Sequence, residues 1–261
     1  MMRVLVGAIC VVAATQALAF DAADLARLNG TGSCKGCDLR GAELRDKDFK
    51  RADLRETKLR EADLKGINLS GADLRGADLR RAELERAILT GARLNEAELR
   101  RADLEKAGLS KANLSEADLH EVDLEEAKLD DAKLIKSDLR RADLKRASLE
   151  RADLTRAALD GADLERANAK GAVLIQADLG RADFSGADLT KADLSHANLS
   201  RVNFTGASLA DANLDDATLR RTDFFGANLS GATGLTEARI ARACGDDLTV
   251  LPEEFRIRPC R

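Results

Sequence analysis

The sequence predicts an all-β solenoid, and two observations support that prediction. A five-residue phrase, Ala-Asp-Leu followed by two variable residues, repeats without a break in register from Cys37 to Gly231, giving 39 pentads and 195 of the 261 residues. Apolar residues occupy its first and third positions: the third is Leu in 34 pentads and Phe in four, and the first is Ala in 31. So short and regular a repeat indicates one small structural unit stacked many times.

A period of five fits neither a straight helix nor a flat strand. A helix advances about 100° per residue, so five residues overshoot a turn by roughly 140° and the apolar pairs would share no face. A strand alternates faces with period two, so every second pentad would point its Leu toward water. The chain must therefore turn once per pentad, and the last two residues form the corner. Gly is frequent at the last position, as at Gly66 and Gly71, where a corner favours a backbone conformation that costs other residues energy.

The phrase resembles the pentapeptide-repeat family, whose repeat is written A(D/N)LXX, and the resemblance covers about three-quarters of the chain. It implies a right-handed quadrilateral β-helix with four pentads in each coil. The sequence supports a coil of twenty residues independently, because Phe184, Phe204 and Phe224 recur at that spacing. About ten such coils at ~4.8 Å per strand layer predict a rod roughly 47 Å long.

Residues 1–19 are predicted to be a secretory signal peptide. Arg3 precedes an apolar run from Val4 to Ala14, and Ala17-Leu18-Ala19 supplies a cleavage site before Phe20. A retained membrane anchor is the alternative, for which the run is short. Cleavage predicts a periplasmic or secreted protein with no membrane span, and it changes the net charge from −4 to −5 because only Arg3 is removed.

The flanks of the repeat are predicted to cap the solenoid, because an uncapped end would expose core. Residues 20–36 form the predicted N-terminal cap, with a short helix at 21–29, and residues 232–261 form the C-terminal cap. Thr236 is the predicted N-cap of a second helix that ends near Cys244. Two short strands are expected after it, at 248–251 and 255–257. The one charged residue at an inward position, Lys47, is expected to reach out through the open end of the first coil.

Four cysteines remain after cleavage, and an oxidising compartment favours disulfides. Four cysteines allow three pairings, but a disulfide requires α-carbons within about 7 Å, and the rod separates the two halves of the set. The expected pairings are therefore Cys34–Cys37 and Cys244–Cys260. A redox or metal role for Cys34-x-x-Cys37 is the alternative, although a redox motif expects a βαβ context and zinc needs four close ligands.

No catalytic, cofactor-binding or metal-binding arrangement is predicted. His120 and His196 lie at outward positions in different columns, about four coils apart. Carboxylates recur at the second position of the pentads, where they are expected to accept hydrogen bonds at the corners. The chain has no Trp and no Tyr, which argues against single-stranded nucleic acid as a ligand. The sequence thus predicts a non-enzymatic protein with no small-molecule substrate and no nucleic-acid partner.

The outward positions distribute charge unevenly over the four walls of the predicted rod. The wall built on Leu39 and Leu59, termed the arginine wall, has 13 basic and nine acidic residues, and its candidate interaction residues are Arg40, Arg60, Arg80, Arg100 and Arg140. The next wall, built on Leu44 and Leu64 and termed the acidic wall, has 15 acidic and seven basic residues. Neighbouring Asp and Arg residues pairing along a solvated face is one interpretation. The other is a polarised prism whose walls recruit protein partners or each other.

A second candidate interaction surface is an apolar patch on the wall built on Leu54 and Leu74. The patch consists of Ile135, Val173 and Ile175, all at outward positions. Ile135 and Ile175 are two coils apart, so about 10 Å by strand spacing. Three neighbouring apolar residues are a modest signal, and chance placement is the alternative.

The sequence therefore predicts an exported, non-catalytic rod with a structural or protein-interaction role. Some members of the family it resembles mimic duplex DNA in charge and shape and bind DNA gyrase, as in the quinolone-resistance proteins. A DNA-mimicking topoisomerase binder is thus the alternative function. The acidic wall is compatible with it, whereas the signal peptide and the arginine wall are not. The sequence predicts neither the partner nor the oligomeric state.

Overall fold

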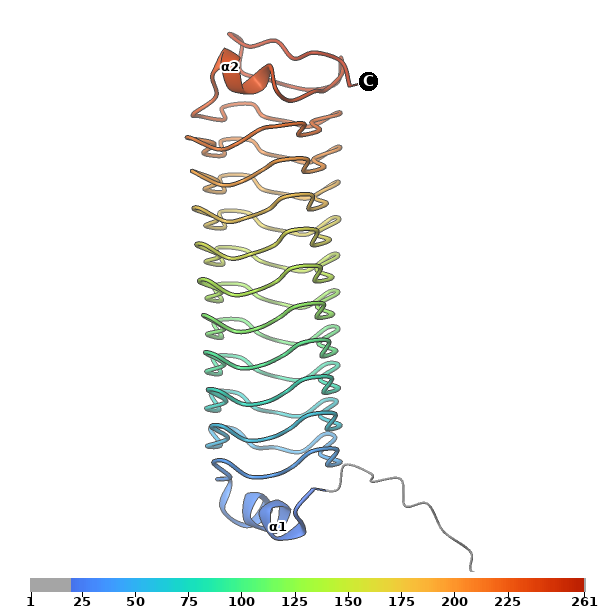
Figure 1. The fold of residues 1–261 in the computed structure, drawn as a ribbon, viewed down its shortest axis with the longest axis vertical. Coiled ribbons are helices and arrows are strands. Elements are labelled where there is room, and N and C mark those ends of the chain that lie inside the picture. Colours follow the sequence, from blue (N-terminus) through green and yellow to red (C-terminus); the bar gives the residue numbers. More distant parts are fainter. Residues whose placement is uncertain (1–19, 261) are drawn as a thin grey trace, which may run out of the picture.

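Residues 20–260, which the computed structural model describes, form one elongated rod with a short helix at each end (Figure 1). Helix α1 (Ala22–Thr31) closes the N-terminal end and helix α2 (Glu237–Ile240) lies at the C-terminal end. The signal peptide predicted at residues 1–19 lies outside the described residues. Within residues 20–260 neither helix has the length and apolar character needed to cross a membrane.

Each coil of the rod takes twenty residues, as the spacing of the Phe residues predicts. Parallel bridges join second-position residues twenty apart along the repeat, for example Asp38 with Lys58. The phenylalanines form a column: the ring centroids of Phe184 and Phe204 are 5.4 Å apart, as are those of Phe204 and Phe224. Four pentads therefore complete one coil, and successive coils stack in register.

The ladder between coils consists of single residues and contains no contiguous strand within the described range. In one pentad, Lys58 donates its N–H to the coil below at 2.8 Å, and Leu59 and Glu61 donate to the coil above at 2.7 and 3.0 Å. The next N–H, from Ala62, closes a turn onto the Leu59 carbonyl at 3.0 Å. Because this turn recurs every five residues, the short strand expected at the first three positions is reduced to a one-residue bridge.

The core is the stack of first- and third-position side chains, which are buried along the rod. Three polar residues at inward positions are buried as well, and each hydroxyl donates to a backbone carbonyl at 2.8 Å, from Thr57, Ser137 and Thr222. Buried polar groups with a hydrogen-bond partner cost little stability. Lys47 is exposed, as predicted for an inward position in the first coil.

The fifth residue of every pentad adopts a left-handed backbone conformation. Its φ lies between +54° and +70° in all 39 pentads, although 28 of these residues are not Gly. This conformation costs a non-Gly residue roughly 1–2 kcal/mol. The geometry expected from the frequent Gly is confirmed, but most corners are made by Arg, Glu, Lys or Asp. The N–H of such a residue bonds to the next coil, as for Glu61, which offsets part of the strain.

Helix α1 begins as the sequence predicts and extends further than 21–29. The Asp21 side chain accepts the N–H of Ala23 at 2.8 Å, which satisfies one free donor at the helix start. Gly32, at φ +64°, ends the helix by bonding its N–H to the Leu28 carbonyl at 2.9 Å. The Leu28 side chain is buried against the first coil. The helix therefore covers core that the first coil would otherwise expose.

The C-terminal cap differs from the prediction in two respects. Thr236 caps helix α2 as expected, but the helix ends at Ile240, and its predicted extension to Cys244 is wrong. The chain rejoins the ladder instead: the Cys244 N–H donates to the Thr222 carbonyl at 3.0 Å. The strands expected at 248–251 and 255–257 are absent from the described C-terminal cap, where Val250 makes a single bridge. Pairing with the last coil thus outweighs local helix and strand preference here.

Gly91 and Lys111 are successive fifth-position residues of one column and measure the cost of the corner. An added Cβ at Gly91 meets no atom within 4 Å, so Gly91→Ala should destabilise through its φ of +65° alone, by about 1 kcal/mol. Lys111→Gly should stabilise by about 0.5–1 kcal/mol, because Lys111 has a φ of +61°. Denaturant unfolding midpoints measure both. Shifts of the same sign for the two variants would contradict the assigned strain.

Ala169 is the one small residue at a third position and lies between Leu149 and Leu189 in its column. We predict a local void there and expect Ala169→Leu to raise the melting temperature, because a buried Leu-to-Ala difference is worth about 2–5 kcal/mol. Leu109→Ala, at a fully buried position, is the control and should lower it by a comparable amount. A lower melting temperature for Ala169→Leu would mean that the backbone has closed around Ala169.

Candidate functional site

The second-position carboxylates act at the corners of the coil, as the sequence predicts. Asp123 Oδ1 accepts the N–H of Glu125 at 2.9 Å, and Asp103 accepts that of Glu105 at 3.0 Å. Asn residues do the same, and a hydroxyl at the fourth position adds a second bond, as Thr155 does to Asp153 at 2.6 Å. These side chains therefore stabilise turns, which is the function expected of Asp and Asn beside a turn.

The two histidines lie apart from each other, at the outward positions expected. His120 is half-buried, with Nε2 3.5 Å from Glu121. His196 is exposed, with Nδ1 3.8 Å from Asp216. Within the part of the chain that the structure describes, neither histidine side chain makes a hydrogen bond to a Ser or Cys. The histidines thus provide no nucleophile–base pair.

The predicted interaction residues of the arginine wall are all ion-paired. Arg80 donates Nε and Nη2 to Asp78 at 2.8 and 2.7 Å. Arg100 pairs with Asp118, and the Nε of Arg60 lies 3.5 Å from Glu61. The same two-bond pairing within one pentad joins Asp38–Arg40 and Asp138–Arg140. The structure thus favours pairing along a solvated face, and a role of this wall in partner binding stays a prediction.

The acidic wall holds a line of carboxylates one coil apart. Burial raises the pKa of the Asp123 carboxyl, and the carboxylates of Asp103 and Asp143 raise it further. Lys145 bridges two members of the line, with Nζ 2.7 Å from Asp143 and 2.9 Å from Asp163, and these bonds raise the pKa of Lys145. The fold therefore disfavours the charged form of Asp123.

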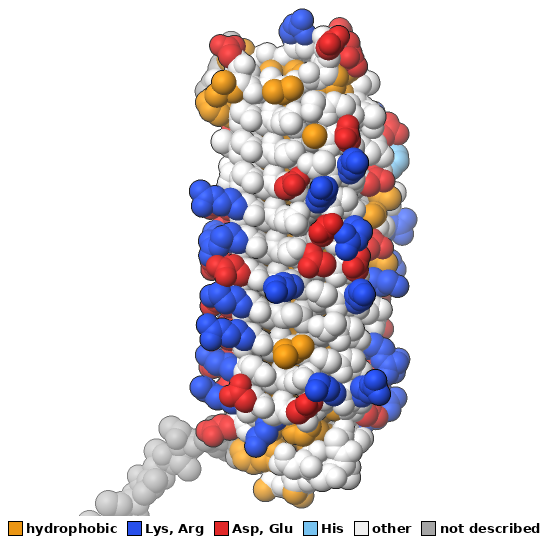
Figure 2. Space-filling view, turned by 180° about the vertical axis from the view of Figure 1, so that it is seen from behind, with side chains coloured by type: hydrophobic (Ala, Val, Ile, Leu, Met, Phe, Trp, Pro, Cys, Tyr) orange, Lys and Arg blue, Asp and Glu red, His pale blue; other side chains and the backbone are white. Residues whose placement is uncertain are grey.

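The apolar patch is less exposed than its outward positions suggest. Ile135, Val173 and Ile175 are all half-buried, and in the twenty-residue register Thr155 lies between the two Ile residues. Figure 2 shows one side of the rod, on which charged side chains lie along the edges and over part of the face between them, and apolar side chains gather at both ends. The most exposed large apolar side chains, with exposed fractions of 43–71%, are Ile88, Phe225, Leu248 and Val250. Sequence reasoning missed these four, although Ile88 and Phe225 stand out as apolar residues at outward positions.

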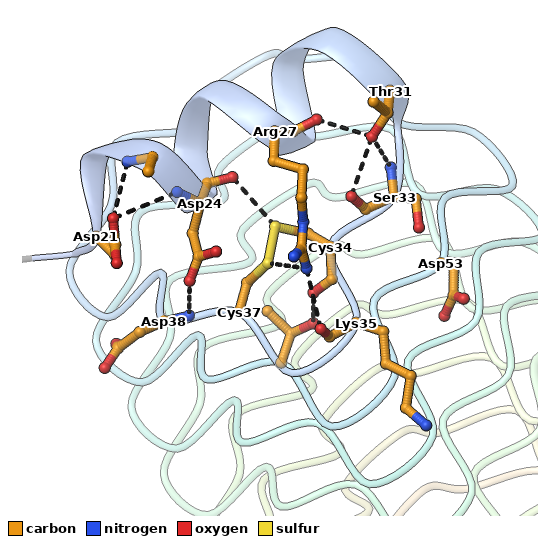
Figure 3. Close-up of a disulfide and its surroundings, with 12 residues drawn as sticks. Asp21, Asp24, Arg27, Thr31, Ser33, Cys34, Lys35, Cys37, Asp38 and Asp53 are labelled. Carbon is orange, nitrogen blue, oxygen red and sulfur yellow. Dashed lines mark hydrogen bonds between the residues drawn. A yellow bond between two sulfur atoms is a disulfide. The ribbon is translucent and has the colours of Figure 1, made fainter.

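The first disulfide joins Cys34 and Cys37, with α-carbons 5.3 Å apart, and fastens the start of the first coil beneath α1. Figure 3 shows Arg27 reaching from α1 to this turn, where Nη2 lies 2.7 Å from Cys37 Sγ and 3.0 Å from the Lys35 carbonyl oxygen. Asp24, also on α1, accepts the N–H of Asp38 at 2.8 Å. The cap is thus held by a covalent bond and by polar contacts from two turns of the helix.

The second disulfide joins Cys244 and Cys260, with α-carbons 4.8 Å apart. Cys244 lies directly above Asp223 in the ladder, so the disulfide fastens the end of the described chain to the last coil. Both disulfides have the partners that the length of the rod predicts. Asp24 and Asp223 each lie beside one disulfide, but its two cysteines are bonded to each other and offer no thiolate ligand for zinc.

A family model described as pentapeptide repeats matches the chain in eight copies, which together span residues 33–233. The chain belongs to the pentapeptide-repeat family. Members of this family form right-handed quadrilateral β-helices, which confirms that part of the expected fold. The family match describes a repeat and names no catalytic family.

Solved structures similar to this pentapeptide-repeat protein include HetL from the cyanobacterium Nostoc sp. strain PCC 7120, a pentapeptide-repeat protein involved in regulation of heterocyst differentiation. HetL is 32% identical, with a TM-score of 0.53 over 89% of this chain and 100% of HetL. A thylakoid-lumen pentapeptide-repeat protein of Arabidopsis thaliana is 35% identical over 35% of this chain and 68% of its own, with a TM-score of 0.30. QnrB1, a plasmid-mediated fluoroquinolone resistance protein, is 18% identical over 77% of this chain and 86% of its own, with a TM-score of 0.47. A search of curated proteins finds no match.

Asp123→Asn should stabilise the protein at pH 7. The amide keeps the oxygen that accepts the Glu125 N–H and removes a charge that burial and two neighbouring carboxylates disfavour. Because the folded pKa of Asp123 is raised, its favourable contribution is complete below the unfolded pKa of about 3.9 and is lost as pH rises through the folded pKa. The gain from Asp123→Asn should therefore vanish near pH 3. Thermal unfolding as a function of pH measures it.

Asp138→Asn is the matched control with the opposite sign. Hydrogen bonds from Arg140 lower the pKa of Asp138, so its contribution is present above the unfolded pKa and is lost as pH falls through the folded one. The variant should lower the melting temperature at pH 7, and this effect should shrink as pH falls below the unfolded pKa of about 3.9 and through the lower folded pKa. Destabilisation by both variants at pH 7 would contradict the different environments assigned to the two carboxylates.

Proposed function

We propose that this chain is an exported, non-catalytic rod of about ten coils that acts as a structural or protein-interaction element. The observation that carries the proposal is the ladder itself, in which each coil is bonded to the next and outward side chains recur in fixed columns. Such a rod presents side chains at constant spacing over its whole length. Protein partners recognise that kind of surface through complementary charge or apolar contact.

Export to the periplasm or to the outside of the cell is part of this proposal. Its support is the pair of disulfides at the two ends of the rod, since disulfides persist in oxidising compartments and are rare in reducing ones. The apolar run after Arg3 and the cleavage site before Phe20 supply a signal of the matching kind. Cap disulfides and signal peptide thus point to one compartment.

N-terminal sequencing of the mature protein tests export. We expect cleavage before Phe20, and intact mass without reduction should be four hydrogens below that of the reduced chain because both disulfides are formed. An uncleaved product with free thiols would overturn the proposal. It would favour the alternative, a cytoplasmic DNA-mimicking topoisomerase binder that uses the acidic wall.

The arginine wall and the apolar patch are the two surfaces through which we propose that a protein partner binds. Arg80→Glu/Arg100→Glu changes the first, and Ile135→Asp/Ile175→Asp changes the second. All four side chains point outward, so both double variants should fold. We expect partner capture from the exported fraction to be lost in one variant only.

The dependence of partner binding on ionic strength distinguishes the two surfaces. Binding through the arginine wall should weaken at high ionic strength, because exposed charges are screened within about 10 Å at 0.1 M salt. Binding through the apolar patch should be insensitive to salt. Capture at parental levels by both double variants would exclude both surfaces.

A further inference from the structure

An open groove of about 470 Å³ runs along the arginine wall, within the size range of small-ligand sites. Its lining contains no acidic residue and consists of fourth- and fifth-position side chains from successive coils: Arg60, Arg80, Arg81, Arg100, Arg101 and His120. Their carboxylate partners lie at its margin, where Glu61 is 3.4 Å from Arg81 and Glu121 is 2.7 Å from Arg101. The groove is therefore basic, whereas the surface around it is approximately neutral.

The pentad of Arg60 lacks the Asp that pairs with the fourth-position arginine in three other pentads of this wall. In three other pentads of the wall an Asp two residues earlier accepts two hydrogen bonds from the fourth-position arginine, in the pairs Asp38–Arg40, Asp78–Arg80 and Asp138–Arg140. In the pentad of Arg60 that position is Lys58. The Arg60 guanidinium consequently lacks the two-bond Asp pairing, its Nε lies 3.5 Å from Glu61, and Lys58 adds a positive charge.

Two unsatisfied polar atoms mark the same groove. Arg60 Nε is buried and has no hydrogen-bond partner, since Glu61 lies 3.5 Å away without the alignment of a hydrogen bond. His120 Nδ1 is buried without a partner as well. In residues 20–260 no other buried side-chain nitrogen or oxygen lacks a partner. Because such groups are rare in folded proteins, their occurrence in one groove points to a ligand that supplies the missing bonds after small side-chain rotations.

We propose that this groove, termed the arginine groove, binds a small multivalent oxyanion that carries two or more phosphate or carboxylate groups. Guanidinium groups offer paired N–H donors that match both kinds of anion. Arginines on successive coils are about one strand spacing apart, ~4.8 Å, so the anionic groups of one small molecule reach two or three coils. The proposal goes beyond the protein-interaction role, because it requires no partner chain.

The charges around the groove explain why the ligand must be multivalent. Arg60, Arg80 and Arg100 stack like charge on like charge at one-coil spacing, which is unfavourable without anions between them. Carboxylates at the margin of the groove, such as Glu98 at 3.1 Å from Arg80 Nε, relieve the repulsion between the arginines only in part. They also repel an incoming anion, so a single charge gains little. A ligand that contacts several arginines at once gains enough to compete with them.

Titration calorimetry of the full-length mature protein with sodium tripolyphosphate, at a constant ionic strength of about 0.15 M, tests the proposal. We expect saturable binding at one site per chain, with inorganic phosphate at least tenfold weaker. Citrate in a parallel titration distinguishes the source of the ligand chemistry: tighter citrate binding assigns a carboxylate ligand and tighter tripolyphosphate binding a phosphate ligand. Absence of binding of either anion at millimolar concentration would overturn the proposal.

Two variants remove the surplus charge in different ways. Arg60→Gln deletes the guanidinium whose Nε has no hydrogen-bond partner. Lys58→Asp introduces the two-bond pairing that Arg40, Arg80 and Arg140 make, so that Arg60 is neutralised by an Asp of its own pentad. Each variant should lower the affinity for tripolyphosphate about tenfold, the loss expected for one charge-assisted contact. If Arg60→Gln fails to fold, Lys58→Asp still tests the proposal, because Asp is the usual second-position residue of the repeat and this variant should fold.

Arg140→Gln/Arg141→Gln is the matched control, since these residues occupy the same two positions on the same wall outside the groove. The control should bind tripolyphosphate within twofold of the parent. Equal weakening in the control and in the groove variants would show that the anion binds the wall as diffuse charge, and the proposed site would be wrong. Loss of anion binding in Arg60→Gln with partner capture intact would separate this site from the proposed protein-interaction function.

Discussion

The rod depends on one local constraint, the turn that every pentad closes between its third-position carbonyl and the N–H of the next first position. This turn requires a left-handed residue at the fifth position, and the chain meets the requirement 39 times, mostly without Gly. The backbone strain is offset because each corner also aligns three N–H groups with carbonyl oxygens of the neighbouring coils. A single corner would be unfavourable alone, whereas a stack shares the alignment among all its members.

The same constraint explains what the sequence could and could not predict. Register and core follow from the spacing of Ala and Leu, because one misplaced residue would expose every later Leu. Coil length follows from the recurrence of Phe184, Phe204 and Phe224 every twenty residues. The disulfide pairings follow as well, since the rod holds Cys34 and Cys260 far apart. The end of α2 does not follow: local preference after Thr236 favours a longer helix, and the backbone groups of the last coil compete for Cys244. Sequence periodicity contains no information about that competition.

Surface pairing was predictable only in part. The Asp-x-Arg phrase indicates a pair when both residues stand at the second and fourth positions of one pentad, as in Asp38–Arg40. Pairs between coils, such as Arg146 with Glu126, need the twenty-residue register as well and also depend on side-chain rotamers. The absence of an Asp two residues before Arg60 was visible in the sequence as Lys58, but its meaning required the geometry of the Asp–Arg pairs in other pentads. The half-burial of Ile135 likewise came only from the structure.

In a fold this repetitive, departures from the repeat carry the functional information. Asp at the second position is explained by the corner hydrogen bond and implies no ligand. A residue that abandons that bond, as Lys58 and Ile88 do, gives up local stabilisation at an exposed position, where no packing gain compensates for it. Lys58 replaces the Asp that would pair with Arg60, whose Nε lacks a hydrogen bond in a basic groove, whereas Ile88 leads only to an exposed apolar side chain with no neighbour of its kind. The arginine wall is therefore the surface on which the sequence and the geometry depart from the repeat together.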